Sequence, residues 1–501
     1  WLRPAANVPP DRALAEWGMA MANINNQKRA RGFIAKAVER KDKADAREQL
    51  WIAMFDNYLK EDKRTKNRRE LDCIGDIEKI VQQHPEDIEA KAFLAWKIWH
   101  GKGDAPISSP MAVQALLDQV FAAEPAHPAH HYSIHLWDGF KPEQGLKSAA
   151  ACGPAAPGIA HMWHMPGHIY SKLRRYDDAA WQQEASTRVD HAYMIANFVQ
   201  PDQIHNYAHN EEWLIRTFNE LGQAGKAEGL ARALIANPQH PANNTLDKSG
   251  CSASYGRTRL IETLIKWEKW PELLAVCADN SRLAPQVQQV SHEVTRLRAL
   301  GLAHFAQESA TELAKVTARL AELDKTEAEK AKKAQAKPAE AGKPEAKDAP
   351  KEDKPASTPD TVKADIIVEK PAAVPQPSKP AAKPATPAKT RPTETALKEL
   401  RLLEAVLAKS PDAAKTMGEL KNLDKILAAR CWLHLGDKAK AEETAKSFAQ
   451  DLASLIAKAD ILDRCGKQVD ARGAFTAAQK AAFAMDAELP AAQGVKELAQ
   501  K

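Results

Sequence analysis

The chain has 501 residues and a mass of 55.0 kDa, enough for several domains or one long repeat array. Its 71 Lys and Arg against 66 Asp and Glu give a net charge of only +5, of which +3 lies in residues 337–392. The rest of the chain lacks the strong positive charge typical of proteins that bind nucleic acids or acidic membranes. No run of about 18 apolar residues occurs, so we expect no membrane span.

The start of the chain and its cysteines say little about its compartment. The first residue is Trp, and the opening residues lack the basic and apolar stretches of a signal peptide, so we expect a processed or trimmed product. The six cysteines form no CxxC pair and no CxxCH haem site. Cys152 and Cys251 are a candidate disulfide if the chain is exported, and the alternative is six unpaired, mostly buried thiols.

Helical periodicity dominates from the N-terminus onward. Ala, Leu, Lys, Glu and Gln are abundant, apolar residues recur at i, i+3 and i+4, and Gly, Pro, Asn or Asp follow each periodic stretch. The predicted helices span 11–23, 27–40, 45–60, 87–101, 109–123, 128–138, 141–151, 159–174, 176–196, 202–221, 224–236, 254–268, 270–280, 286–305 and 308–335.

A recurring turn joins these helices in pairs. A first helix with small residues leads into a tight turn, and an Ala-rich second helix follows. Pairs of about 34 residues are typical of tetratricopeptide repeats, which stack into a solenoid with a concave face. The pattern is seen in LRRYDDAAWQQEA (173–185), LGQAGKAEGLARAL (221–234), KWEKWPELLAV (266–276), WLHLGDKAKAEETA (432–445) and CGKQVDARGAF (465–475).

Residues 337–392 differ from the rest of the chain, with 12 of its 31 Pro mixed with Lys, Ala and Glu. A segment this poor in large apolar residues buries too little surface to offset its ordering entropy. We therefore predict an all-α protein in three parts. They are a tetratricopeptide-like solenoid at 1–336, a disordered linker at 337–392 and a small helical repeat body at 393–501.

Histidines are concentrated in the middle of the chain, where ten of the 16 fall between His127 and His209. They gather in three segments, HPAHHYSIHLWDG (127–139), HMWHMPGHIY (161–170) and DQIHNYAHNEEW (202–213). Each segment contains a pair spaced four residues apart, which places both imidazoles on one face of a helix. The three pairs are His131 with His135, His164 with His168, and His205 with His209.

Two imidazoles at this spacing can reach one metal ion. If the pairs lie on the first helices of successive repeats, they converge on one pocket on the concave face. Imidazole ligation favours copper, zinc, iron or nickel over calcium and magnesium. Six imidazoles can hold two ions, and three can hold one with a position left open. Candidate groups that would orient the imidazoles are Asp138, Asp202, Tyr207, Glu211 and Glu212.

Other interpretations of the histidines stay open. They can bind a polar ligand without metal, or they can pack between repeats and bond backbone carbonyls. Pro166 also weakens the second pair, since it removes one helical hydrogen bond and can kink the helix between His164 and His168. The GxGxxG, GxxxxGK[ST], HExxH and GxSxG motifs are all absent, so we expect no nucleotide, flavin or haem and identify no catalytic residue.

The segments HHYSIHLWD, HMWHMPGHIY and HNYAHN together resemble a group of bacterial tetratricopeptide-repeat proteins with motifs of the form HYxIH, HMPxHIY and HNY. AEWGMAMA at 15–22 is similar to the opening helix of that group, and the likeness covers about residues 11–280. It implies an α/α solenoid but no reaction. The group's histidines match His131, His135, His164, His168 and His205, whereas His209 departs from the pattern. Many such proteins look exported, which implies an extracytoplasmic location, with a cytoplasmic one as the alternative.

Three functions follow as hypotheses. The first is a repeat scaffold whose histidine-lined pocket binds a metal ion or polar ligand, while its C-terminal helices recruit a protein or peptide partner. The second is a copper- or iron-dependent oxidase or oxygenase with the histidines as ligands. The third is a metal-free structural adaptor.

Overall fold

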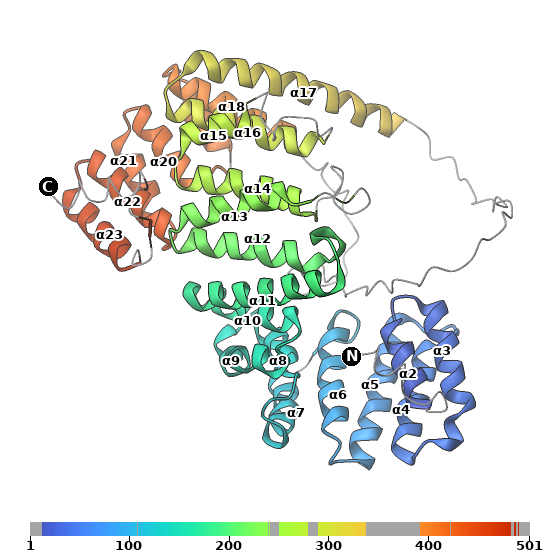
Figure 1. Cartoon of the computed structure of the whole chain (residues 1–501). Helices are drawn as coiled ribbons and strands as arrows, with labels where there is room; N and C mark the ends of the chain where they lie inside the picture. The colour runs from blue at the N-terminus through green and yellow to red at the C-terminus, as the bar shows by residue number, and fades with distance from the viewer. Residues whose placement is uncertain are drawn as a thin grey trace. The chain divides into compact units, whose positions relative to one another are not determined.

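The computed structural model of the chain is all-α (Figure 1). It describes residues 13–107, 109–238, 240, 250–278, 289–336, 391–420, 422–481, 485, 486 and 489. Every regular element within these ranges is a helix, which confirms the predicted fold class. Nearly all of the predicted linker at 337–392 lies outside the described residues. The chain divides into two compact units, Trp1–Asn197 and Phe198–Lys501.

The first unit is a succession of helices in which each packs against the next along the chain. Helices two apart also touch, as α2 does with α4, α6 with α8, and α8 with α10. This neighbour pattern is that of stacked helical hairpins. The helices are α2 (Ala13–Ala22), α3 (Gln27–Glu39), η1 (Lys41–Lys43), α4 (Ala46–Leu59), α5 (Lys66–Gln83), α6 (Ile88–His100), η2 (Gly101–Gly103), α7 (Pro110–Ala123), α8 (His130–Trp137), η3 (Pro142–Gly145), α9 (Leu146–Ala155), α10 (Ala160–Lys172) and α11 (Tyr176–Asn197).

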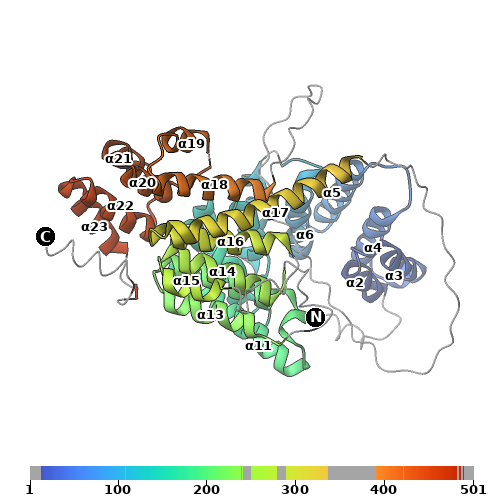
Figure 2. The same ribbon diagram turned by 90° about the horizontal axis from the view of Figure 1, so that it is seen from above.

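The second unit repeats the same packing rule, with α12, α14, α16, α18, α20 and α22 each touching the next of that series. Figure 2 shows α16, α17 and α18 running side by side within it. Its helices are η4 (Pro201–Gln203), α12 (His205–Glu220), α13 (Ala224–Ala236), α14 (Ser252–Lys266), α15 (Trp270–Cys277), α16 (Val290–Ala306), α17 (Ala310–Ala336), α18 (Pro392–Leu407), α19 (Ala413–Glu419), α20 (Lys425–His434), α21 (Lys438–Lys446), α22 (Leu452–Arg464) and α23 (Gln468–Ala481).

One turn geometry joins many of the hairpins. The second residue after the first helix has a positive φ, and the N–H of the residue that follows it donates to the carbonyl five residues earlier. This is the Schellman ending, which satisfies carbonyls left free at a helix C-terminus. Of the seven positive-φ positions in these turns, three hold Gly. The seven positions are Arg174, Gly222, Glu268, Glu308, Lys409, Gly436 and Gly466.

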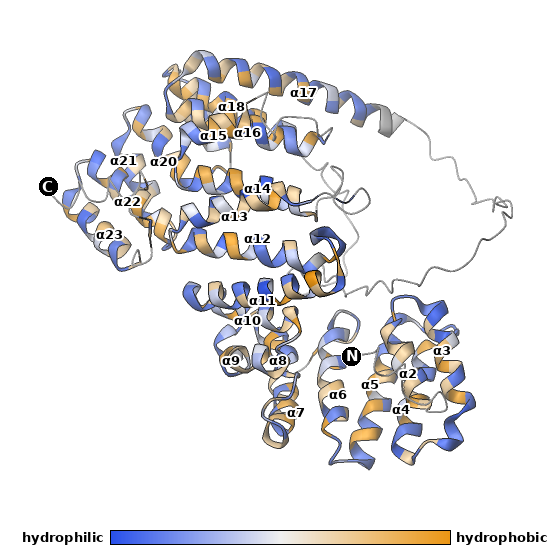
Figure 3. Cartoon of the chain, viewed as in Figure 1, coloured by the Kyte–Doolittle hydropathy of each residue, from blue (hydrophilic) through white to orange (hydrophobic). Residues whose placement is uncertain are grey.

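Apolar side chains fill the contacts between helices, and the alternating colours of Figure 3 follow this one-sided pattern. In the first unit, Ile134 of α8 packs in one buried cluster with Met165 and Ile169 of α10. Gly145 allows this approach, since a Cβ there would lie 2.7 Å from Ile169 Cδ1. These contacts fix α8 against α10, the two helices that carry the first histidine segments.

The structure differs from the sequence prediction in two places. Helix α5 was not predicted, although it begins at an N-cap, Thr65, and buries Ile77 and Ile80. The predicted boundary at 393 is not a division between compact units. Leu400 and Leu403 of α18 are fully buried in one core with residues of α16 and α17, so the chain after the linker continues the unit that precedes it.

None of the six cysteines forms a disulfide, and all are buried except the half-buried Cys465. The candidate Cys152–Cys251 disulfide is therefore not formed, and the alternative of six thiols without disulfides, mostly buried, is confirmed. No helix in the described part of the chain is both long and apolar enough to cross a bilayer.

Candidate metal centre

Three histidines from two helices converge in the first unit. His131 and His135 lie one turn apart on α8, and His161 lies in the first turn of α10. Each offers a ring nitrogen, and these three atoms all lie within 4.8 Å of one another. The predicted convergence of imidazoles from neighbouring helices is thus seen at these three positions, and all three side chains are half-buried.

In this group, called the histidine triad below, the ring of His131 contacts the rings of both His135 and His161. The ring centroids are 4.6 Å apart for His131 and His135, and 4.9 Å apart for His131 and His161. Nε2 of His131 lies 2.9 Å from Nε2 of His135, so one nitrogen carries a proton and the other accepts it. Nitrogen ligands of a tetrahedral zinc ion are about 3.3 Å apart, so the triad needs only small side-chain movements to hold one.

Trp99 of α6 supports the triad from outside. Its indole stacks on the His135 imidazole with centroids 4.4 Å apart and planes 22° apart. Trp99 is itself nearly buried, and the Lys102 ammonium lies 4.7 Å from its ring centroid. A ring packed in this way has few alternative rotamers, so Trp99 holds His135 in the orientation that faces His131.

The surroundings of the triad keep the imidazoles of His131 and His135 neutral. Burial, with smaller contributions from the neighbouring His161 and His168, lowers the pKa of His131 to about 3. Burial also takes the pKa of His135 well below its ordinary value, with His131 and His168 adding to the effect. Since neutral imidazole is the form that binds metal, these two rings need not lose a positive charge before they bind a metal at neutral pH.

A second pair of histidines lies beside the triad on α10. The ring of His164 is 5.7 Å from that of His161, and its Nε2 is 2.9 Å from Nε2 of His168. The kink that Pro166 could introduce does not separate this pair, because α10 runs without a break from Ala160 to Lys172. Proline costs one hydrogen bond there, and the buried packing of α10 against α9 and α11 keeps the helix intact.

Both members of the α10 pair have partners at Nδ1. His164 Nδ1 lies 2.9 Å from Oε1 of Gln183, a fully buried residue of α11. His168 Nδ1 lies 3.6 Å from Oδ2 of Asp138, which follows α8. Asp138 was one of the predicted orienting groups, and the structure places it beside His168.

The third predicted pair belongs to the second unit. His205 begins α12, but its side chain is outside the described residues. His209 Nδ1 lies 3.7 Å from Oε1 of Glu212, and its ring packs edge to face on Trp213. Metal ligation by His205 and His209 stays a prediction.

The remaining predicted orienting groups have partners within the second unit. The carboxylate of Glu212 forms an ion pair with the guanidinium of Arg259. Asp202 accepts hydrogen bonds from the backbone N–H and the hydroxyl of Ser252. Glu211 is buried beside Tyr207, and burial raises the pKa of its carboxyl to about 7. The described contacts of these side chains account for them as structural groups of η4, α12 and α14.

Sequence analysis missed some residues of the centre. His161 stood in the second histidine segment but was left out of the predicted ligands, because only spacing of four was counted. Its position three residues before His164 was the available signal. Trp99 and Gln183 come from other helices, and no local pattern marks them.

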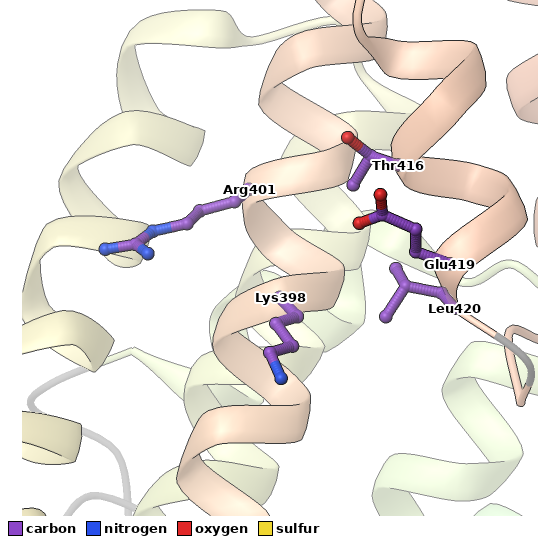
Figure 4. Close-up of a pocket in the computed structure, with 5 residues that line it drawn as sticks. All are labelled: Lys398, Arg401, Thr416, Glu419 and Leu420. Carbon is purple, nitrogen blue, oxygen red and sulfur yellow. The ribbon is translucent and has the colours of Figure 1, made fainter.

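A shallow pocket lies elsewhere, between α18 and α19 of the second unit (Figure 4). Glu419 and Thr416 point toward α18, while the Arg401 side chain points away from them. Lys398 is paired with Glu394 on its own helix at 2.8 Å. This mixture of charges is that of an ordinary protein surface, and we assign the pocket no role.

Comparisons with known proteins add little to this description. The sequence matches no protein-family model and no curated protein. Among solved structures, a similar chain occurs in the structure of Naa15/Naa10 bound to HypK-THB, with 12% identity and a TM-score of 0.24. The match covers 97% of this chain and 72% of that chain. A likeness at this level carries no argument, so the fold assignment rests on the helices and their packing.

Proposed function

We propose that this chain is a helical-repeat scaffold that binds one transition-metal ion through the histidine triad, His131, His135 and His161. The observation that supports it is the convergence of three ring nitrogens within 4.8 Å, from two helices held together by a buried core. Histidines that serve only packing have no need to direct their nitrogens at one another.

The donor set decides which metals fit. Three imidazoles without thiolate or carboxylate suit copper, zinc, iron or nickel, as the sequence suggested. Calcium and magnesium prefer oxygen ligands and are disfavoured. Within the triad, Trp99 orients His135, and the surrounding protein keeps His131 neutral, so the site has its ligands in place before the metal arrives.

The number of ligands supports a second candidate function, the copper- or iron-dependent oxidase or oxygenase. Structural zinc sites are closed by four protein ligands, whereas three ligands and one open position are typical of catalytic sites. The triad supplies three. Oxygen uptake by the copper- or iron-loaded protein with reductant present would support this candidate, and metal binding without any uptake would favour the scaffold.

The proposal also carries over the resemblance to bacterial tetratricopeptide-repeat proteins with histidine motifs. We propose with it an extracytoplasmic location, a protein or peptide partner for the repeats, and a triad that faces the concave side of the helical array. Fractionation of the native host and crosslinking of the full chain test the location and the partner.

A metal titration with a matched control tests the scaffold proposal. The protein is stripped with chelator, titrated with Zn²⁺ or Cu²⁺, and its bound metal is measured by elemental analysis. We expect one tightly bound equivalent in the wild type and in His191→Ala, a variant of an exposed histidine of α11. His131→Ala and His161→Ala should lose that equivalent while keeping their helical circular dichroism. Equal binding by wild type and His131→Ala, or no binding by either, would contradict the proposal.

A further inference from the structure

The α10 pair, His164 and His168, has a hydrogen-bond arrangement of its own. Their Nε2 atoms face each other at 2.9 Å, as those of His131 and His135 do. His164 is almost completely buried and His168 is half-buried, so this pair has one ring inside the helix packing and one nearer the solvent. The partner at Nδ1 determines which nitrogen of each ring carries the proton.

Gln183 fixes the tautomer of His164. The amide nitrogen of Gln183 lies 3.3 Å from the His164 carbonyl oxygen and donates to it, which sets the orientation of the amide. The amide oxygen therefore faces His164 Nδ1 at 2.9 Å and accepts its proton. With the proton on Nδ1, Nε2 of His164 carries a lone pair.

Gly167 makes this double contact possible. A Cβ at position 167 would lie 2.3 Å from the amide nitrogen of Gln183, so any larger residue would push the amide away from α10. Gln183 is fully buried, and close packing of this kind restricts the rotamers of a side chain. The packing of α11 against α10 thus fixes the tautomer of His164 that has a lone pair on Nε2.

His168 completes the arrangement through Asp138. In the neutral pair, His168 Nε2 donates to His164 Nε2, which leaves His168 Nδ1 without a proton opposite the Asp138 carboxylate at 3.6 Å. If the proton moves from Nε2 to Nδ1 of His168, it faces the carboxylate, and both Nε2 atoms then carry lone pairs. A cation between the two nitrogens favours this shift, and no proton is released.

We propose that His164 and His168 form a second transition-metal site through their Nε2 atoms, with Gln183 and Asp138 as positioning residues. A histidine ligand whose other nitrogen is held by an amide or carboxylate is the usual arrangement in metal sites. The two sites share no ligand. The second site therefore rests on the proposed function only in that both treat the histidine cluster as a metal centre. With two protein ligands instead of three, the second site binds more weakly than the triad.

Calorimetric titration of the stripped full-length chain with Zn²⁺ tests this proposal. The wild type should bind two equivalents in two steps of different affinity. Gln183→Leu should weaken the second step by about 10–100-fold and leave the first unchanged. Gln183→Glu keeps an acceptor for His164 Nδ1 and should retain most of the second step. Gln182→Leu is the matched control, because Gln182 is the neighbouring buried glutamine and its side-chain oxygen makes no described hydrogen bond.

The half-buried His168 offers a second variant if Gln183→Leu does not fold. His168→Ala should lose the second equivalent and keep the first. A single equivalent in the wild type that His131→Ala abolishes and His168→Ala leaves intact would overturn the second site while the proposed function stands. Equal second steps in the wild type and Gln183→Leu would also overturn it. Absence of any bound zinc would overturn both proposals.

Discussion

The imidazoles of His131 and His161 lie edge to face, with ring centroids 4.9 Å apart and planes 77° apart, although they come from different helices. Thirty residues and the whole of α9 separate them along the chain. Their contact depends on the core between α8 and α10, in which Ile134 and Ile169 are fully buried. The metal centre that we propose is therefore a property of the packed hairpins and not of either helix alone.

Two helical glycines should respond in opposite ways to alanine. Gly167→Ala would drive a Cβ into the Gln183 amide, and we expect a loss of about 1–3 kcal/mol in the free energy of unfolding. Gly75→Ala in α5 meets no atom within 4 Å and should stabilise the chain by about 0.5–1 kcal/mol. Urea unfolding measures both. Equal effects of the two substitutions would show that the close approach of α11 to α10 is absent.

Removing one partner of the buried ion pair between α5 and α6 should lower the free energy of unfolding strongly. Lys97 Nζ lies 2.7 Å from Glu70 Oε2, both side chains are almost fully buried, and Tyr58 donates to the same carboxylate at 2.8 Å. Lys97→Met leaves an unpaired buried carboxylate and should cost about 3–5 kcal/mol of unfolding free energy.

The double variant Glu70→Gln/Lys97→Met removes both charges and keeps an acceptor for Tyr58, so it should recover most of that loss. The same urea unfolding experiment compares the two. A double variant as unstable as Lys97→Met would show that the cost comes from lost packing and not from the charge.

The shared turn geometry predicts a stabilising substitution. Lys409 has a φ of 50° at a position where Gly436 has 82° in the corresponding turn. Lys409→Gly should raise the unfolding free energy by about 1 kcal/mol, because glycine adopts positive φ without steric cost.

Gly436→Ala is the converse of this change. No atom lies within 4 Å of the Cβ it would add, so only backbone strain acts, and a loss of about 1 kcal/mol is expected. Thermal unfolding of both variants checks the pair. A destabilised Lys409→Gly would mean that the lysine side chain contributes more than its backbone costs.

The buried carboxyl of Glu211 predicts how stability changes with pH. Burial raises its pKa from the ordinary 4.5 to about 7, against a smaller opposite effect from the Tyr207 hydroxyl. The folded state therefore favours the protonated form. This contribution is complete below pH 4.5 and is lost as the pH rises through 7.

Glu211→Gln is permanently neutral and should remove this dependence. Its advantage over the wild type should grow between pH 5 and pH 8 to about 3 kcal/mol. Denaturant unfolding at a series of pH values measures the difference. A constant difference across that range would show that Glu211 titrates near its ordinary pKa.

Most of the fold was predictable because helical periodicity and turn residues are local signals. Helix α13 occupies its predicted range. Other helices, such as α10 and α11, begin and end within about two residues of their own predicted ranges. Some hairpin turns were less visible, since Glu308 and Lys409 hold positive φ where the pattern favours glycine. Helix α5 was missed although Ile74, Ile77 and Val81 have helical spacing, because charged residues surround them.

The candidate site was predictable only in part. Spacing of four identified His131 with His135 and His164 with His168, because one helix brings each pair together. The choice of His161 as the third member depends on how α10 packs on α8, which no local pattern encodes. The same holds for Gln183, whose contact with His164 spans 19 residues.

X-ray absorption at the metal edge of the protein loaded with one equivalent of zinc tests the central claim most directly. The account predicts a nitrogen-rich ligand shell with the scattering pattern of three imidazole rings, and a loss of one imidazole contribution in His161→Ala. A shell of oxygen ligands alone, or a spectrum that His161→Ala leaves unchanged, would contradict it.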